Sequence, residues 1–200
     1  MGSEMCIRDS NYNRQPIVYK SQIDENREGL LVGGGSYNGP IYNALIRCEE
    51  IDKLKEMIKY YDFVELQPMD QYLYLIEDES FHEMDSIKNI NRRLYDAAKE
   101  VNVPVFANGD VYYIDQSDSV YRSILVFNRK NFVGSRKECN NTDHYFKTTK
   151  ELLNCFPYLS EDETKEIVID NTLAFAEKFE NIRPIPKDTF PPFIENSDKD

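Results

Sequence analysis

Histidine, cysteine and clustered acidic residues are the side chains that hold metal ions, and this 200-residue chain has few of them in useful patterns. Its histidines are His82 and His144, and neither stands in a His-x-His, His-x-x-His or Asp-x-His pattern. His82 lies in an acidic stretch, whereas His144 directly precedes Tyr145 and Phe146. We therefore expect a surface or hydrogen-bonding role for both histidines.

The cysteines and the glycine run are equally poor candidates for chemistry. The cysteines are widely spaced, with no C-x-x-C pair: Cys6, Cys48, Cys139 and Cys155. This spacing predicts reduced, buried thiols rather than a zinc site or a disulfide framework. The glycines at residues 33–35 lack the endings of phosphate-binding loops, so a tight turn is favoured there.

The charge of the chain excludes one class of function. Acidic residues outnumber basic ones 36 to 24, which gives a net charge of −12. A surface that grips DNA needs clustered lysine and arginine, so this segment is expected to bind DNA poorly by itself. No apolar run approaches the roughly 18–20 residues that cross a bilayer, and the N-terminus has no signal pattern. The expected compartment is the cytosol, with no membrane contact.

Strands and helices alternate along the first two thirds of the chain. The pattern predicts a short buried strand at residues 30–32, helical segments at 41–61 with a break near Cys48, and a strand at 62–67. An amphipathic helix follows at 84–101, and we expect its charged residues to form a solvated face: Lys88, Arg92, Arg93 and Lys99. Residues 104–107 are expected to form another buried strand, which ends at a turn over residues 108–110.

Capping residues indicate where the later helices begin. Ser117 is expected to cap a helix that runs through Val120, Ile124 and Leu125. Two S/T-x-x-E pairs predict further helix starts, at Thr148 with Glu151 and at Ser160 with Glu163. We expect the last helix to reach about Phe179, and the proline-rich residues 183–192 to form an extended strip. The order of elements predicts an α/β fold with parallel strands, too few to close a barrel.

The first ten residues resemble a translated adapter from sequencing libraries more than they resemble protein. We therefore set residues 1–10 apart as an expected artefact, so that the natural segment begins at Asn11 with further chain before it. The sequence stops in Asn-Ser-Asp-Lys-Asp after the proline-rich strip, which is a second expected break.

Five short blocks, in one order, resemble the PolC-type DNA polymerase III alpha subunit family. Each has a counterpart in the family's later PHP region, and together they cover nearly all of the chain after its first ten residues. The blocks are NREGLLVG (residues 26–33), YYDFVELQP (60–68), VPVFANGDV (103–111), YFKTT (145–149) and IRPIP (182–186) with the prolines at 191–192.

The resemblance implies a fold and a place in a larger protein. It implies that residues 11–182 are the part of a PHP domain, a distorted (β/α)7 barrel, that follows an inserted exonuclease. Residues 183–200 would then be a proline-rich linker toward the polymerase core. The parent would be a replicative DNA-directed DNA polymerase with a 3′–5′ exonuclease. It would use Mg²⁺ held by carboxylates outside this chain. The implied partners are the rest of that polymerase chain and the replisome, with DNA bound by other domains.

The resemblance also implies that the metal ligands of the PHP domain are altered here. Ser36 stands where the family has cysteine, and Tyr37 and Pro40 stand where it has acids. In the family's Asp-x-His motif Asp110 remains, but Tyr112 replaces the histidine. Asp110 is thus a weak, residual metal ligand position, and it is equally well explained as a turn residue after glycine. We expect neither a catalytic residue nor a bound cofactor in this segment.

Two alternatives remain open from the sequence. One is a standalone PHP-type metal-dependent phosphoesterase, and the other is a non-catalytic interaction module. An incomplete barrel leaves an open sheet edge and an uncovered core face, so we expect poor solubility or association when the segment is expressed alone.

Overall fold

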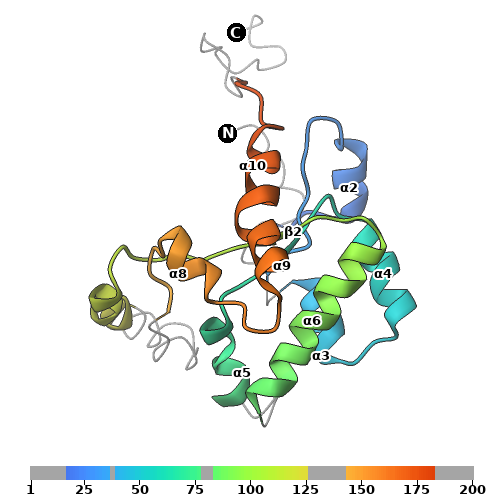
Figure 1. Cartoon of the computed structure of the whole chain (residues 1–200). Helices are drawn as coiled ribbons and strands as arrows, with labels where there is room; N and C mark the ends of the chain where they lie inside the picture. Colours follow the sequence, from blue (N-terminus) through green and yellow to red (C-terminus); the bar gives the residue numbers. More distant parts are fainter. Residues whose placement is uncertain (1–16, 37–38, 78–82, 126–142, 183–200) are drawn as a thin grey trace, which may run out of the picture.

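The computed structural model describes residues 17–36, 39–77, 83–125 and 143–182. A small parallel sheet lies at the centre of these residues, with helices packed around it (Figure 1). Strand β1 (Val64–Leu66) pairs in parallel with β2 (Val105–Ala107), as the strand-helix-strand order predicts. A further parallel bridge joins Gly33 to Phe63. A Cβ atom at position 33 would lie 2.5 Å from the Phe63 ring, so any other residue there would force the ring to move. The partial barrel stays a prediction.

Several predictions concern positions outside the described residues. These are the expected artefact at residues 1–10, the proline-rich linker from residue 183, and the roles of Tyr37, His82, Cys6 and Cys139. No helix in the described ranges is both long enough and apolar enough to cross a membrane.

The helical segments predicted before β1 are confirmed, including their break. Helix α3 spans Pro40–Ile46 and α4 spans Ile51–Lys59. Cys48 lies between them with φ of 55°, a left-handed conformation that stops the first helix. Cys48 is exposed, so the prediction of a buried thiol is wrong at this position, because the turn that it occupies lies on the surface. Cys155 is partly buried.

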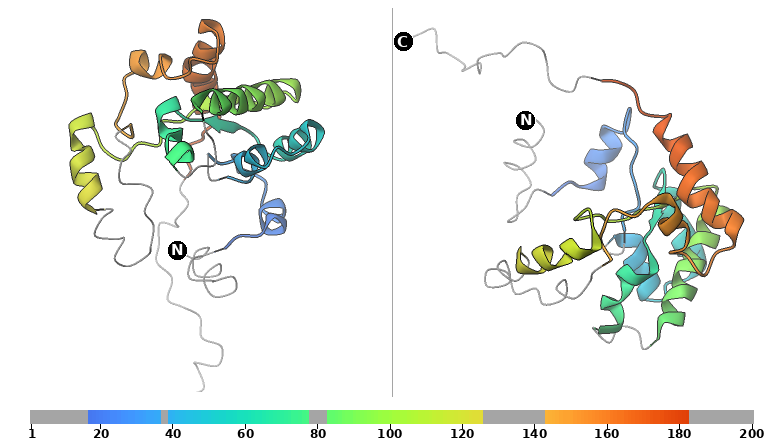
Figure 2. Two further views of the ribbon diagram at one scale, coloured as in Figure 1. Left: turned by 90° about the horizontal axis from the view of Figure 1, so that it is seen from below. Right: turned by 60° about the vertical axis from the view of Figure 1, so that its left-hand side comes forward.

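The amphipathic helix between the two strands is confirmed as α6, which spans Met84–Glu100. Its apolar side chains, such as Ile87 and Leu94, are buried in the same core as Val64 and Val105 of the sheet. Figure 2 shows α6 lying beside α3 and α4 on one side of the strands. This arrangement follows from the 3.6-residue period of the sequence, which gives α6 one apolar face to bury.

The charged side of α6 does more than face solvent, which corrects the expectation of a solvated face. Arg92 forms an ion pair with Glu163 at 2.8 Å, and Arg93 donates to the backbone carbonyl of Glu49 at 2.5 Å. These two arginines therefore join α6 to elements on both of its sides. The sequence period identified the polar face, but it did not indicate which neighbours would contact that face.

The C-terminal helices begin where their capping residues predicted. Helix α8 spans Thr149–Leu153 and α9 spans Glu161–Lys165, and each has a complete capping box. A π-helical turn, η4 (Glu166–Asp170), and α10 (Asn171–Ala176) continue the last helix without a break. The helix thus ends close to the predicted residue, but the π turn was not predicted. The Asn171 side chain donates to the Val105 carbonyl at 2.9 Å, which places this helix against the edge of β2.

The prediction of a buried strand at residues 30–32 is wrong in part. Leu30 and Leu31 are exposed, and the only bridge of this segment within the described residues is the one at Gly33. The segment is held mainly through Asp62, whose carboxylate accepts the Val32 N–H at 2.7 Å. Among the described residues, this segment pairs only with the chain at Asp62 and Phe63, so it lies at the edge of the sheet and is not a central strand.

The predicted cap at Ser117 is also wrong. Asp115 is the N-cap of a 3-10 turn, η2 (Gln116–Asp118), and Asp118 completes the capping box. Aspartate has the same ability as serine to accept the free backbone amides, and it occurs first along the chain. Helical residues follow at 119–125, as expected. The remaining short elements are α2 (Lys20–Glu25), η1 (Met69–Tyr72) and α5 (Tyr74–Glu77).

Candidate functional site

Polar residues gather where β1 and β2 end, because the two strands are parallel and their carboxyl ends meet at one edge. Asn108 follows β2, and its side-chain amide donates to the Glu65 carboxylate at 3.0 Å. Its side-chain oxygen accepts the Asp110 N–H, also at 3.0 Å. Asp110 has φ of 41°, so it occupies the left-handed conformation that aspartate tolerates in turns. The turn is therefore organised by Asn108, which the sequence did not single out.

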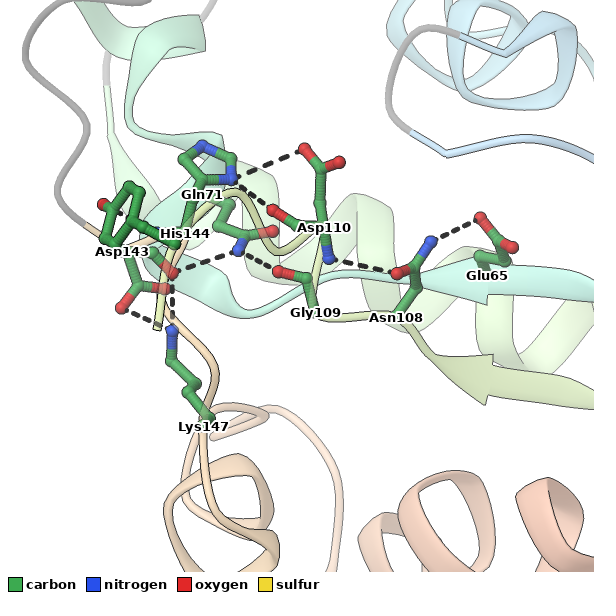
Figure 3. A network of polar contacts seen from close by, with 9 residues as sticks. Glu65, Gln71, Asn108, Gly109, Asp110, Asp143, His144 and Lys147 are labelled. Carbon is green, nitrogen blue, oxygen red and sulfur yellow. Dashed lines mark hydrogen bonds and ion pairs between the residues drawn. The ribbon is translucent and has the colours of Figure 1, made fainter. Parts of the chain in front are cut away.

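Asp110 and His144 lie side by side in the structure, although 34 residues separate them in the chain (Figure 3). The His144 Nδ1 atom is 2.9 Å from the Asp110 carbonyl oxygen and 3.4 Å from its carboxylate oxygen Oδ2. A carbonyl oxygen only accepts, so Nδ1 carries a proton and donates it. The His144 ring also packs against Tyr112, with centroids 4.9 Å apart. The predicted hydrogen-bonding role of His144 is confirmed.

Gln71 connects this turn to the segment that carries His144. The side chain comes from η1 and is only 1% exposed. Its Nε2 atom donates to the Gly109 carbonyl at 2.5 Å and to the Asp143 carbonyl at 3.1 Å. Figure 3 shows Gln71 between the two segments. One buried amide thus fixes the spacing between the turn after β2 and the chain around residue 143.

Asp143 is neutralised by a lysine from its own segment. The Lys147 Nζ atom lies 2.9 Å from the Asp143 carboxylate, and the two side chains are 5% and 13% exposed. The same ammonium group donates to the Asp143 carbonyl at 2.5 Å. Burial raises the pKa of Asp143, and Lys147 opposes that rise only in part. The carboxylate therefore depends on Lys147 for its stabilisation.

The positions aligned with the family's ligands do not all come together. Asp110 lies in the cluster. Tyr112 packs its ring against His144 and donates its backbone N–H to the His144 carbonyl at 2.9 Å. Pro40 is the first residue of α3, a helix position that suits proline because it needs no backbone N–H. The Ser36 carbonyl accepts the Gly39 N–H at 2.7 Å and closes the turn before α3. Across residues 17–36, 39–77, 83–125 and 143–182, no group of three or more histidines, cysteines and acids is placed to hold a metal ion.

Sequence reasoning found Asp110 but missed most of its surroundings. Gln71 and Asp143 belong to no motif, and Lys147 lies in the YFKTT block with no role assigned to it. The contacts that join these residues span up to 72 residues. The one signal in the sequence was the position of Asp143 and His144 immediately before the YFKTT block. That adjacency indicated a shared segment, but not its contact with the turn after β2.

Comparison with known proteins gives this chain a family context. No protein-family model matches it. It is similar to DNA polymerase III PolC-type of Clostridium perfringens, with 35% identity over 94% of this chain and 13% of the relative. It is also similar to the Thermotoga petrophila protein of the same description, at 36% identity over 92% of this chain and 13% of the relative. The Bacillus subtilis protein is 31% identical over 94% of this chain and 13% of its own length. The resemblance predicted from the five blocks is confirmed.

Proposed function

We propose, from the similarity of this chain to one segment of PolC-type DNA polymerase III proteins, that it is part of a bacterial replicative DNA polymerase. The observation that carries the proposal is the extent of the similarity. It covers 92–94% of this chain in each of the relatives described. The chain spans only 13% of the length of those relatives. A match of this kind is expected of one portion of a large enzyme.

Within that polymerase, we assign the chain to the later part of a PHP domain with a structural role. The contacts at the strand ends support this role. Asp143 is held by Lys147, and the Nδ1 atom of His144 is held by the Asp110 carbonyl. Asp110 acts in this proposal as a turn residue and a partner of His144, rather than as a metal ligand. The cluster then serves to fix the loops that follow the parallel strands.

The altered ligand positions fit the same proposal. Pro40 begins α3, and the carbonyl of Ser36 closes the turn before that helix. A serine hydroxyl is a feeble ligand for a divalent ion compared with thiolate or carboxylate. Ser36 and Pro40, which are among the aligned positions that the structure describes, thus have structural contacts that account for them.

The activities of the whole protein belong to the proposal as well. The parent would extend a primer with deoxynucleotides, using Mg²⁺ bound by carboxylates elsewhere in the polypeptide. DNA and the other replisome components would be bound by other regions, because this segment has a net charge of −12. The segment itself would brace the polymerase core.

Sequencing the DNA on both sides of this coding segment tests its place in a polymerase. We expect exonuclease-coding sequence upstream and palm-coding sequence downstream, in one reading frame. Stop codons that bound the segment would reject the proposal in favour of a small separate protein, such as the standalone phosphoesterase.

Metal analysis tests the structural role separately. The polypeptide with its upstream PHP portion, purified without chelators, is assayed for zinc and manganese and for cleavage of bis(p-nitrophenyl) phosphate. We expect less than stoichiometric metal, no turnover, and the same metal content in the Asp110→Asn variant. Stoichiometric metal that is lost in Asp110→Asn, together with turnover in the unsubstituted protein, would show that the site is catalytic.

A further inference from the structure

The helix at residues 119–125 presents an apolar face to solvent. Its four large apolar side chains, Val120, Tyr121, Ile124 and Leu125, are each between 53% and 68% exposed. Figures 1 and 2 show this helix at the periphery of the molecule, away from α4 and α6. Single exposed apolar residues are ordinary on a protein surface, but four on one short helix indicate a contact surface.

Two further apolar side chains are exposed on chain segments near this helix. Ile114 is 74% exposed and Phe146 is 68% exposed, and the Phe146 N–H donates to the Ile114 carbonyl at 3.2 Å. The Arg122 guanidinium lies 3.9 Å from the centroid of the Tyr112 ring, so the helix is attached to this same part of the molecule. We call these residues the outer apolar surface: Ile114, Val120, Tyr121, Ile124, Leu125 and Phe146.

We propose that the outer apolar surface docks onto another part of the same, longer polypeptide, at an apolar face with a basic rim. This inference rests on the proposed function, because it requires the remainder of a polymerase chain. The relatives are long enough for this chain to span only 13% of them, so most of the polypeptide lies elsewhere. A tethered partner has a high effective concentration and needs less intrinsic affinity than a free one.

Charge favours this occupant over a second copy of the chain. The helix is preceded by Asp115 and Asp118, which place acidic groups beside the apolar side chains. The chain as a whole carries a net charge of −12, so two copies repel one another. A partner face with lysine and arginine around an apolar centre complements both features.

Site-specific photocrosslinking in the intact polymerase tests the proposal. Benzoylphenylalanine replaces Tyr121 in one preparation and Glu56, an exposed residue of α4, in the control. We expect crosslinks from position 121 to a stretch of the same polypeptide outside this segment, at least tenfold above those from position 56. Crosslinks to a second copy, to another protein, or at no more than the control level would overturn the inference.

A pair of substitutions provides an independent readout in the same intact protein. We expect the double variant Ile124→Ser and Leu125→Ser to raise the rate of proteolytic cleavage within residues 119–125 at least tenfold. The control is Leu173→Ser, which changes an exposed leucine of α10. Cleavage that is unchanged in the double variant, or equally fast in the control, would count against docking. If either test fails in an intact polymerase, only the docking inference is contradicted and the proposed function still holds. Stop codons around the segment would instead contradict the proposed function itself.

Discussion

Two buried glutamines on either side of Pro68 provide a controlled test of what holds the candidate site together. Gln67 is 0% exposed and Gln71 is 1% exposed. Gln71 donates to the carbonyls of Gly109 and Asp143, at 2.5 and 3.1 Å. In the described part of the chain, neither side-chain polar atom of Gln67 has a hydrogen-bond partner. The same substitution therefore has opposite consequences at the two positions.

Replacing Gln71 with methionine keeps the shape of the side chain and removes both donated hydrogen bonds. Each such bond contributes about 0.5–1.5 kcal/mol, and a buried acceptor left without a partner costs about 1–3 kcal/mol. The Asp143 carbonyl keeps a donor in Lys147, so only the Gly109 carbonyl loses the partner identified for it. We expect Gln71→Met to lower the free energy of unfolding by about 2–3 kcal/mol.

Replacing Gln67 with methionine removes a buried amide that has no partner to lose. Burial of an unpaired amide costs about 1–3 kcal/mol by mutational measures. We therefore expect Gln67→Met to leave the free energy of unfolding unchanged or to raise it by about 1 kcal/mol. The two variants should differ by about 2–4 kcal/mol in the same host.

Urea unfolding followed by far-ultraviolet circular dichroism measures this difference, and hydrogen exchange locates it. Amides near residues 109 and 143 should exchange faster in Gln71→Met than in Gln67→Met. Equal losses of stability in the two variants would refute the reasoning, because they would show that side-chain shape and not hydrogen bonding fixes this region. A larger loss in Gln67→Met would refute it as well.

Three further predictions follow from other contacts. The hydrogen bond from Arg92 lowers the pKa of Glu163. The stability that this ion pair adds to the folded state is fully present above the ordinary glutamate pKa of about 4.3, and it is lost as pH falls through the lowered pKa. Glu163→Gln should thus cost about 0.5–1 kcal/mol at pH 7. The cost should shrink as the pH falls below the ordinary glutamate pKa, and an unchanged cost across urea titrations at falling pH would contradict the pairing. Burial raises the pKa of the Cys155 thiol to about 11, whereas Cys48 is exposed. Iodoacetamide at pH 8 should therefore label Cys48 at least ~10-fold faster than Cys155 in the folded chain. Equal labelling rates, measured by peptide mass spectrometry, would contradict this burial. Ser160→Ala removes the N-cap of α9 and should cost about 1 kcal/mol by urea unfolding, whereas Ser160→Asp should restore most of it.

The parts of the fold that were predicted correctly are those determined by neighbouring residues. The two capping boxes, at Thr148 and Ser160, depend on residues three positions apart. The break at Cys48 and the apolar stripe of α6 are also local patterns. One error was also local, because Asp115 and not Ser117 caps the 3-10 turn. Other errors occurred where a distant neighbour decides the outcome. The run at residues 30–32 has the composition of a buried strand, but its exposure depends on what lies beyond the edge of the sheet.

The candidate site was less predictable than the fold for the same reason. Asp110 was identified because it follows a strand and occupies a family motif, whereas His144 belongs to no motif. Their contact exists because the chain returns between residues 113 and 145 to form a parallel bridge. A two-residue bridge has no periodic pattern that a sequence would display. Gln71 is a further case, since a polar residue in a helical turn gives no indication that it is buried.

The cluster also shows what stabilises a buried carboxylate in this part of the molecule. A buried carboxylate is stable only with a positive partner or with several donors, and in a metal site the ion is that partner. For Asp143 the partner is Lys147, whose side chain is 5% exposed. A cation that entered here would have to displace this lysine and leave an ammonium group buried without its counter-charge, which is strongly unfavourable. The internal ion pair therefore competes with metal binding at Asp143, and the contacts of His144 and Gln71 hold the pair in place.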